Sequence, residues 1–380
     1  MLGVGQADRR ALIRLVRCSV EPPPESTRRS APTSNVGGMD IGLLLGFENS
    51  ITTITDLARE GESIGCASMY TVEAGRNAIT CAAAVIATTE RVRVGTYIVN
   101  AYARSPWLAG LAARDLDEMS GGRFVLGVGT GNPMFNDLYM GEDSSKPLAK
   151  MRDYVEIVRA VVAGRAGERV RYEGPSHRIR WRATWEPTSP RVPVYLSASG
   201  PNMVRLAGEV SDGVGVGIMA STTFMRDIVR PNATAAAAGA GRDPSEVAFP
   251  MGAMVSVNED AERARHAIAS RICDLFHPVP HPYYDSQLRQ LGFGDFVERA
   301  YELIPAGRRS EAVQLVPDEV IDTMTITGTP ADCARRIREY DGLADEIIVS
   351  RIIQPEEPAG IAAFEPVFEL VSMVSDSGMA

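Results

Sequence analysis

The sequence contains few of the residues from which metal sites and disulfide frameworks are built. Its 380 residues include only four histidines, and no two of them have the HExxH spacing of a zinc-binding helix. The five cysteines are scattered and lack CxxC spacing: Cys18, Cys66, Cys81, Cys273 and Cys333. An odd, scattered set argues against a disulfide framework and a zinc site, and it favours a reducing compartment. We therefore expect no metal centre.

Long hydrophobic runs and an excess of positive charge are also missing. No apolar run reaches the roughly 18 residues that a membrane-spanning helix requires. The formal net charge is −9, whereas nucleic-acid binding needs a concentrated basic surface that neutralises phosphates. The sequence thus predicts a cytoplasmic protein that binds neither membranes nor nucleic acids.

Residues 1–38 differ in composition from the rest of the chain. They carry six arginines against three acidic residues. Arginines interrupt the apolar stretch at 11–17, and a run rich in proline, serine and threonine follows it. This composition predicts a disordered N-terminal extension. At Met39 the sequence changes to an apolar strand, so residues 39–380 are predicted to form one folded domain.

The body of the chain alternates short apolar runs with helical stretches. Alternation of this kind implies βαβ units and a parallel sheet. Eight such repeats favour a (β/α)8 TIM barrel over an open doubly wound sheet. The predicted strands cover residues 41–46, 67–72, 91–99, 124–129, 192–196, 213–218, 247–257 and 346–350. The predicted helices cover residues 53–64, 78–89, 105–119, 151–162, 202–209 and 330–340.

Two segments do not follow this alternation. Residues 164–191 are predicted to be an insertion after the fourth helix, and residues 273–320 a longer, mostly helical insertion around strands seven and eight. The four histidines are expected at the surface: His177, His266, His277 and His281. A substrate pocket is the alternative for His277 and His281. The aromatic residues of the second segment are expected to pack within it, with a substrate wall as the alternative: Phe276, Tyr283 and Tyr284.

The most informative stretch is DEMSGGRFVLGVGTGN at residues 117–132. It predicts the end of a helix, a glycine turn, a buried strand and then a glycine-rich loop. In a barrel, the carboxyl end of a strand belongs to the active-site face. Glycines at that end let backbone N–H groups approach a flat or anionic ligand closely. A tight turn without a ligand is the alternative, because GxGxG alone is a frequent false positive.

This stretch resembles the SGGR and GxG signature of the luciferase-like oxidoreductases, in both their flavin-dependent and F420-dependent branches. The resemblance continues through RVRVGT at 91–96, SGP at 199–201, DG at 212–213 and GTP at 328–330. It covers about residues 39–351 and is weakest over 164–191 and 260–320. The resemblance implies a barrel enzyme with a small-molecule substrate, and related barrels often form homodimers.

The resemblance also implies where the ring of the cofactor lies. Tyr97 and Ile98 align with a non-prolyl cis peptide behind the ring, although an ordinary trans strand is the alternative. Thr130 and Gly131, which follow Gly129, would lie over or beside the ring. Asn100 would contact the edge of the ring, or its side chain would form an Asx turn instead.

The same comparison places the phosphate of the cofactor at the end of the fifth strand. The helix that follows offers free N–H groups and the positive end of its dipole to an anion. A simple capped turn is the alternative. The residues implied in cofactor binding here are Ser197, Ser199, Gly200, Pro201 and Asn202.

The catalytic candidates are Glu73 and Asn132, which we expect nearest to the substrate. Glu73 ends the second strand and is the leading titratable group of the active-site mouth, unless it only caps the next helix. Asn132 stands where relatives place a catalytic carboxylate, so no general acid is assigned there. It could also simply begin a turn with Pro133.

The functional hypothesis is an F420-dependent oxidoreductase that transfers a hydride between the deazaflavin and an organic substrate. The stretch VNAYARSP at 99–106 resembles the F420 branch near the methylenetetrahydromethanopterin reductases. One alternative is an FMN-dependent monooxygenase that a separate reductase supplies. Another is a non-catalytic barrel that binds a flavin.

Overall fold

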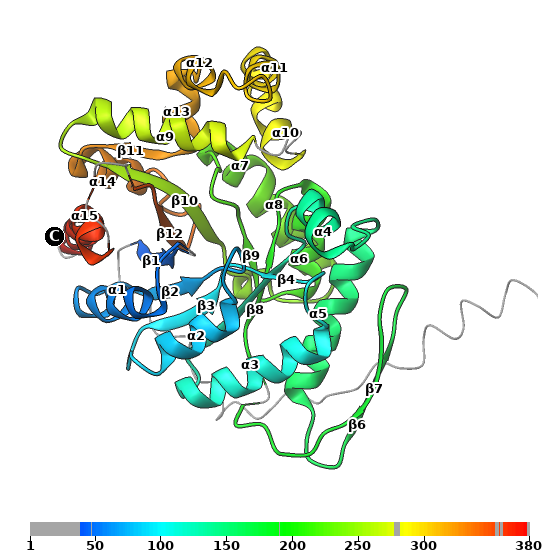
Figure 1. Cartoon of the computed structure of the whole chain (residues 1–380). Coiled ribbons are helices and arrows are strands. Elements are labelled where there is room, and N and C mark those ends of the chain that lie inside the picture. The colour runs from blue at the N-terminus through cyan, green and yellow to red at the C-terminus, as the bar shows by residue number, and fades with distance from the viewer. Residues whose placement is uncertain are drawn as a thin grey trace, which may run out of the picture.

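The computed structural model describes residues 39–46, 48–189, 191–276, 282–353, 357 and 360–377. The predicted N-terminal extension, residues 1–38, lies outside this part of the chain, as do His277 and His281. The described part is an α/β protein in which helices surround a central, strongly curled sheet (Figure 1). No helix within it is both long and apolar enough to span a bilayer.

The central sheet is parallel throughout, and its strand order is β11-β10-β12-β1-β2-β3-β5-β8-β9, with β4 paired to β5. Two strands that are neighbours in sequence are usually neighbours in the sheet, as βαβ connections require. The strands are β1 (Asp40–Leu45), β2 (Ser68–Thr71), β3 (Arg93–Thr96), β4 (Val99–Asn100), β5 (Phe124–Gly129), β8 (Val194–Ser197), β9 (Gly213–Gly215), β10 (Pro250–Val257), β11 (Ile326–Gly328) and β12 (Glu346–Arg351).

The curl brings β9 against β10. The backbone N–H of Val214 donates to the carbonyl of Ala248 at 2.8 Å, and Gly252 donates to Val216 at 2.9 Å. These bonds join the end of the strand order to one of its early members. The predicted α/β class with a parallel sheet is therefore confirmed.

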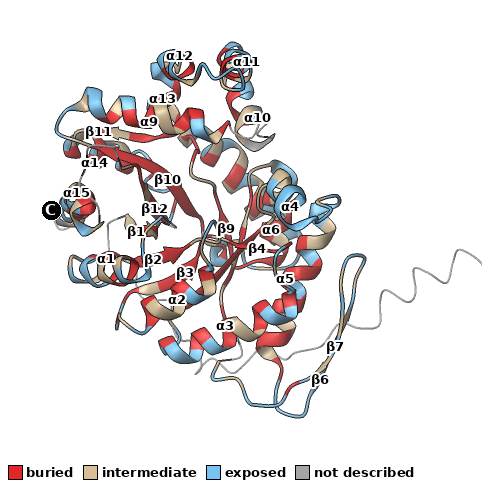
Figure 2. Cartoon of the chain, in the orientation of Figure 1, coloured by how far each residue is buried: buried red, intermediate tan, exposed pale blue. Residues whose placement is uncertain are grey.

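Helices cover the outside of the sheet and bury one face each (Figures 1 and 2). Their starts follow capping chemistry, because the side chains of Ser50, Asn77 and Ser105 each accept a backbone N–H in the first turn. The outer helices are α1 (Ile51–Ser63), α2 (Ala78–Ile86), α3 (Pro106–Ser120), α4 (Pro133–Met140), α5 (Pro147–Ala163), α6 (Pro201–Val210), α7 (Thr222–Phe224), α8 (Arg230–Gly239), α9 (Ala261–Leu275), α14 (Pro330–Arg338) and α15 (Glu365–Ser377).

Three short turns of other helix types complete these connections. They are a π-helix at Met225–Val229 and 3₁₀ helices at Pro244–Glu246 and Gly360–Phe364. The main apolar core lies between the sheet and the outer helices, and β5 is buried along its whole length. A continuous apolar strand such as β5 is expected where both faces of a parallel sheet are covered.

A second apolar cluster lies under four helices at the top of Figure 1. It packs α9 against these helices, and Phe276 contacts the rings of Phe296 and Tyr301, as the predicted packing role requires. The four helices are α10 (Pro282–Gln290), α11 (Gly294–Leu303), α12 (Arg309–Gln314) and α13 (Asp318–Met324).

Residues 164–191 contain an antiparallel hairpin of β6 (Arg169–Glu173) and β7 (Arg178–Arg182), which projects from the body in Figure 1. One face of the hairpin is half-buried or buried, and Tyr172 on that face donates to Asp153 at 2.8 Å. The other face is exposed and carries five arginines and one glutamate. On this face Arg169 stands opposite Arg182 in the pairing register.

Several of the observed helices were not among the sequence predictions: α4, α7, α8, α9 and α15. Most side chains of α4 are exposed or half-buried, so it has no apolar periodicity to detect. Helix α8 is a run of alanines, whose small apolar side chains give no clear stripe. Helix α9 begins before the segment that was predicted to be an insertion.

Candidate functional site

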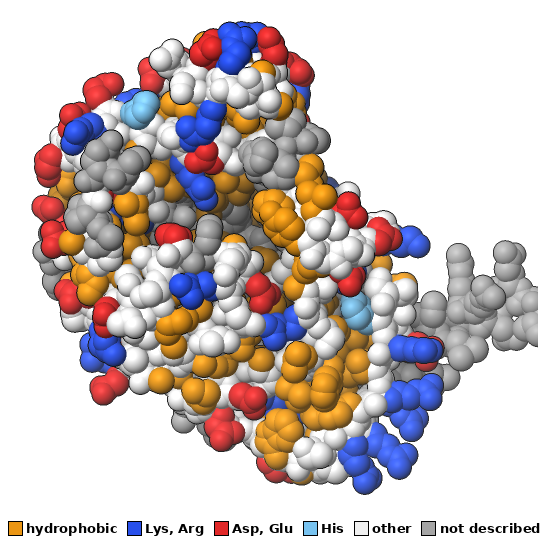
Figure 3. Space-filling view, viewed as in Figure 1, with side chains coloured by type: hydrophobic (Ala, Val, Ile, Leu, Met, Phe, Trp, Pro, Cys, Tyr) orange, Lys and Arg blue, Asp and Glu red, His pale blue; other side chains and the backbone are white. Residues whose placement is uncertain are grey.

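A cavity of about 1160 Å³ opens at the carboxyl ends of the central strands. Leu44 of β1, Val72 after β2, Ser197 at the end of β8 and Gly217 after β9 line it. Figure 3 shows this face hollowed between the upper helices and the rest of the body. In proteins of this architecture, ligands bind at the carboxyl ends of the strands. The cavity is therefore the candidate active site.

Tyr97 and Ile98 line the cavity and are joined by a cis peptide bond. The predicted third strand is consequently divided here into β3 and β4. The Tyr97 hydroxyl donates to the carbonyl of Val216 and accepts the backbone N–H of Gly252 at 3.3 Å. Burial raises the pKa of Tyr97, although the Gly252 N–H opposes that rise. Tyr97 thus fixes the cavity wall through its hydroxyl, which stays protonated.

Gly129 keeps the floor beside Ile98 flat. A Cβ atom at this glycine would lie 3.1 Å from Cβ of Ser197 and 3.2 Å from Cδ1 of Ile98. A side chain would therefore stand between two residues that line the cavity. Gly129, Ile98 and Ser197 are thus neighbours, and their binding of a cofactor stays a prediction.

Gly131 and Asn100 form a tight contact at the edge of the site. Gly131 has φ +62°, and a Cβ there would lie 2.5 Å from Nδ2 of Asn100. That amide donates to Oδ1 of Asn136 at 2.7 Å, and Asn136 donates to the Thr130 carbonyl at 2.8 Å. The buried Asn136 therefore holds the glycine loop against β4. Neither motif nor spacing had indicated Asn136.

Glu73 lies beside this contact and is engaged by other protein groups. Its carboxylate accepts the backbone N–H of Asn100 at 3.0 Å and pairs with Arg104 at 3.2 Å. Both side chains of the pair are largely buried. Glu73 thus holds the segment after β4 against the end of β2, and its contact with a substrate stays a prediction.

Asn132 is the N-cap of α4. Its side-chain oxygen accepts the backbone N–H of Met134 at 2.9 Å, and Pro133 occupies the first helical position. The structure therefore uses Asn132 in the turn that the sequence left open as an alternative. Its placement near the substrate stays a prediction.

The start of α6 has the geometry of an anion site. Gly200 is its N-cap, Pro201 takes the first helical position, and no side-chain cap occurs among the described residues. A Cβ at Gly200 would meet no described atom within 4 Å. The side chain of Asn202 instead accepts from Arg205 at 3.0 Å. Open space before an uncapped helix start is suited to a phosphate.

Ser199 faces the same region from the turn before α6. Its Oγ lies 3.9 Å from the position that a Cβ would take at Gly217. Because Gly217 lines the cavity, the α6 turn adjoins the same hollow as Ser197. The residues that the sequence predicted for the ring and for the phosphate therefore come from neighbouring strand ends.

Asp212 fixes the position of β8 relative to β9. Its carboxylate pairs with Arg191 at 2.7 Å and with Arg159 at 2.8 Å, and it accepts the N–H of Val194 at 2.9 Å. Burial would raise the pKa of Asp212, but the two arginines and this N–H outweigh it and hold the pKa below its usual value. The DG motif at 212–213 is thus an anchor of the strands that carry the site.

The opposite end of the sheet contains a separate polar cluster. Glu346, at the start of β12, accepts from Ser68 and from Tyr70, the latter at 3.0 Å, and it pairs with Arg93 at 3.3 Å. Glu346 is buried, and its charge raises the pKa of Arg93. These residues lie at the amino ends of their strands, where barrels place stabilising residues rather than catalytic ones.

Helix α9 forms one wall of the cavity. The described lining residues that it contributes are Glu262, Arg263, His266, Ala267, Ser270, Arg271 and Asp274. His266 is exposed, as predicted, but it faces the cavity mouth. Tyr284 of α10 also lines the cavity. The sequence left a substrate wall open as the alternative role of Tyr284, but it did not assign α9 to the site, because side-chain periodicity does not tell which element a helix covers.

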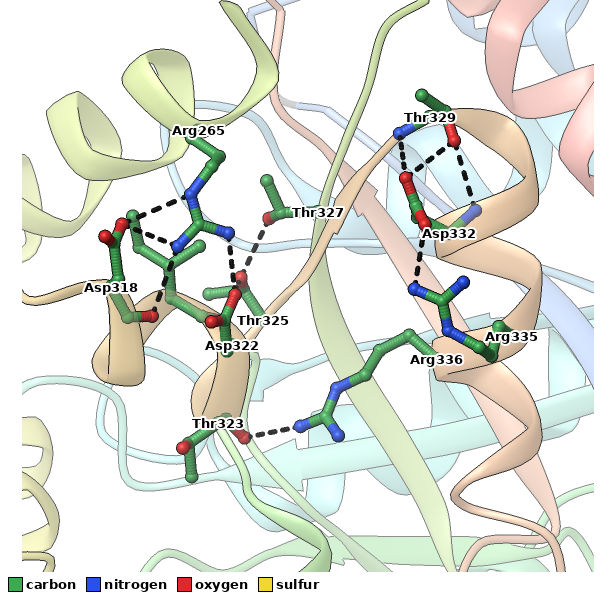
Figure 4. A network of polar contacts seen from close by, with 11 residues as sticks. Arg265, Asp318, Asp322, Thr323, Thr325, Thr327, Thr329, Asp332, Arg335 and Arg336 are labelled. Atoms are coloured by element: carbon green, nitrogen blue, oxygen red, sulfur yellow. Dashed lines mark hydrogen bonds and ion pairs between the residues drawn. The ribbon is translucent and has the colours of Figure 1, made fainter. Parts of the chain in front are cut away.

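Ion pairs on the outer side of α9 hold this wall in place (Figure 4). Arg265 pairs with Asp318 and with Asp322 of α13, each at 2.6 Å. Figure 4 also shows the start of α14, beyond β11. Thr329 and Asp332 cap this helix, and Asp332 accepts a hydrogen bond from Arg335. The helix wall is therefore attached to the sheet through α13 and β11.

Residues 28–346 match the family model described as luciferase-like monooxygenase. The chain belongs to this family. It is accordingly an oxidoreductase of the luciferase-like type.

Individual relatives agree with this assignment. A Mycobacterium tuberculosis protein named as a coenzyme F420-dependent oxidoreductase is 27% identical over 351 residues, which are 86% of this chain and 99% of that protein. The 5,10-methylenetetrahydromethanopterin reductase of Archaeoglobus fulgidus is 31% identical over 72% of this chain and 81% of its own length. The F420-dependent tetrahydromethanopterin reductase structure from Methanopyrus kandleri has the same fold, with a TM-score of 0.72 at 24% identity over 88% and 97% of the two chains.

Proposed function

We propose that this luciferase-like chain is an F420-dependent oxidoreductase that transfers a hydride between the deazaflavin and a small organic substrate. The observation that carries the proposal is one cavity lined by the cis peptide Tyr97–Ile98 and by Ser197, with Gly129 next to Ile98 and Ser197. Relatives whose names include F420 or methylenetetrahydromethanopterin reductase support the choice of cofactor. We also read the curled sheet as a (β/α)8 barrel of one domain, residues 39–380, with insertions at 164–191 and 273–320.

The residues present fit a ring with an anionic tail. The absence of a side chain at Gly129 leaves a flat surface between Ile98 and Ser197, and the open turn at Gly200 faces an uncapped helix start. Ile98, Ser197 and the Thr130–Gly131 loop would hold the ring, with Asn100 at its edge. Ser199, Gly200, Pro201 and Asn202 would hold the phosphate.

When bound, the deazaflavin supplies two-electron hydride chemistry, because carbon replaces the flavin nitrogen at the reactive position. The chain itself orients the ligand and excludes water. The side chains of Leu44, Val72 and Ile218 make the strand-end wall apolar, and α9 limits access from the other side. Tyr97 does not donate a proton to the ligand, because Val216 already accepts its hydroxyl hydrogen.

Fluorescence titration with F420 and FMN side by side tests the proposal. We expect saturable binding of F420 and none of FMN. The variant Ser197→Phe fills the floor of the cavity and should weaken F420 binding by roughly tenfold or more, which corresponds to about 1.4 kcal/mol. Ser63→Phe, an equal change at an exposed position on α1, is the matched control and should bind normally.

Three other results would contradict the proposal. Binding of FMN without F420 would instead indicate the flavin-dependent monooxygenase. Tight binding of F420 without turnover, with every electron acceptor offered, would indicate a carrier. Normal binding in Ser197→Phe would remove the β8 end from the site.

A further inference from the structure

The cavity has two walls of different chemistry. Apolar side chains of the strand ends form one wall, among them Leu44, Ile98 and Ile352. The wall that α9 contributes is polar and carries charges of both signs: Arg263 and Arg271, and Glu262 and Asp274. A ligand that touches both walls must therefore have an apolar part and a polar part.

The polar wall is a single stripe of α9. Arg263, His266, Ser270 and Arg271 recur at helical spacing, so they share one face of the helix. Ile268 and Ile272 on the other side are fully buried in the second apolar cluster. This packing, together with the ion pairs of Arg265, fixes the stripe toward the cavity.

Two charged side chains that line the cavity are already paired with other protein groups. Asp274 pairs with Arg309 at 2.6 Å, and Arg309 also donates to Oγ of Ser270 at 2.8 Å. Arg351 pairs with Glu357 at 2.6 Å and donates to two backbone carbonyls. These groups hold the cavity wall together, and none of these charges is left to attract a ligand.

Arg271 differs from them. It is half-buried, lines the cavity, and has no hydrogen bond or ion pair to any residue within the described part of the chain. Its guanidinium lies close enough to Tyr284 to oppose the rise that burial causes in the pKa of that phenol, which reaches about 12. The Tyr284 hydroxyl in turn lies 3.9 Å from the Cβ position of Gly217, so Arg271 belongs to the end of the cavity near β9.

We propose that Arg271 binds an oxyanion, a carboxylate or a phosphate, of the molecule that occupies the cavity. This inference rests on the proposed function and specifies its ligand. The planar guanidinium can bind such a group through two parallel hydrogen bonds, and partial burial strengthens them. The apolar part of the molecule then lies against the strand ends, and its charged end points to α9. The ligand class is accordingly an organic anion with an apolar body.

A matched pair of probes tests this orientation without any cofactor. Binding of octanoate and of octanol to the cofactor-free protein is measured by calorimetry. We expect octanoate to bind about tenfold more tightly than octanol, because a charge-assisted hydrogen bond from Arg271 stabilises only the carboxylate. Arg271→Gln should abolish this preference, and Arg271→Lys should retain part of it. Arg299→Gln, the same change at an exposed position of α11 outside the cavity lining, is the control and should retain it fully.

The oxyanion could also belong to the cofactor, and a second titration separates the two sources. F420 is compared with its deazaflavin riboside, which lacks the phosphate and the anionic tail. A selective loss of F420 binding in Arg271→Gln would assign the residue to the tail, whereas loss of the octanoate preference assigns it to the substrate. Unchanged results in both titrations, with normally folded variants, would overturn the inference. The octanoate measurement does not depend on F420, so failure of the proposed cofactor is recognised separately.

Discussion

The glycines of the site act through different physical constraints. Gly129 is needed because a side chain would enter the space between Ile98 and Ser197. Gly131 is needed for its left-handed backbone and for the close approach of Asn100. The glycine motif therefore meets two needs: space for neighbouring side chains at one position, and a left-handed backbone at another. Only substitutions can separate these requirements.

Gly131→Ala should lower both stability and cofactor affinity. A left-handed alanine costs about 1 kcal/mol, and its Cβ would in addition displace the Asn100 amide. We expect a lower urea midpoint and F420 binding weakened by roughly tenfold. Gly141→Ala is the control, because Gly141 has φ +65° and no described neighbour within 4 Å of its Cβ position. The control should lose similar backbone stability but bind F420 normally; equal binding by both variants would refute the role of the loop.

The sequence predicted part of the site at residue level. Tyr97, Gly129 and Ser197 stand in motifs; Tyr97 and Ser197 line the cavity, Gly129 lies next to Ser197, and their roles in cofactor binding stay predictions. Asn136 and Arg271 stand in no motif. Their contacts depend on how distant elements pack, and a single sequence does not encode that packing in a readable spacing.

At the scale of the elements, the buried strands were the most predictable. β5 was predicted with its observed limits, Phe124–Gly129, because a continuous apolar run between turn residues has few other interpretations. Helix α9 was missed, although its buried face holds Ile268 and Ile272. The opposite face of α9 is polar because it borders the cavity. The sequence of α9 therefore shows no clear apolar periodicity.

Asp212 should make the pairing of β8 and β9 sensitive to acid. Its pKa is lower in the folded protein than the usual value near 4. The unfolded chain therefore binds this proton more readily, so the contribution of Asp212 to the free energy of unfolding is complete at neutral pH. It is lost as the pH falls below about 4 and through the folded pKa.

Asp212→Asn should consequently lower the free energy of unfolding by about 2 kcal/mol at pH 7. The difference from the original protein should shrink at the lowest pH at which both still fold. Urea unfolding at several pH values measures both quantities. Glu209→Gln breaks an exposed ion pair with Arg152 and should change stability by less than about 0.5 kcal/mol. A constant difference at all pH values would show that ionisation of Asp212 is not the cause.

At the scale of the whole molecule, the α/β class with a parallel sheet followed from the alternation of elements. From β1 to β9 the central strands lie in chain order, as βαβ connections favour, whereas β10 pairs with β12 and leaves β11 on its other side. The helices over the cavity could not be placed in this way. They occupy residues 282–324, outside the repeating pattern, and only their apolar contacts with α9 decide their position.

The cysteines should report on global unfolding. Cys66, Cys81, Cys273 and Cys333 are all buried, and burial raises the pKa of Cys66 and Cys333 to about 12 and of Cys273 to about 11. Buried, protonated thiols react slowly. The variant Cys18→Ser leaves only these four thiols, and an aromatic disulfide reagent at pH 8 should modify them no faster than the protein unfolds. Immediate reaction of any of them in the native protein would contradict the described packing.

The exposed face of the β6–β7 hairpin gives the molecule an uneven electrical character. Like charges directly opposite each other on paired strands are unfavourable, yet Arg169 faces Arg182 and Arg171 faces Arg180 on a chain whose net charge is −9. Among the described residues, the hairpin therefore concentrates positive charge on a narrow projection of a chain whose overall charge is negative. Close to a negatively charged surface, this projection is attracted even while the overall charge is repelled.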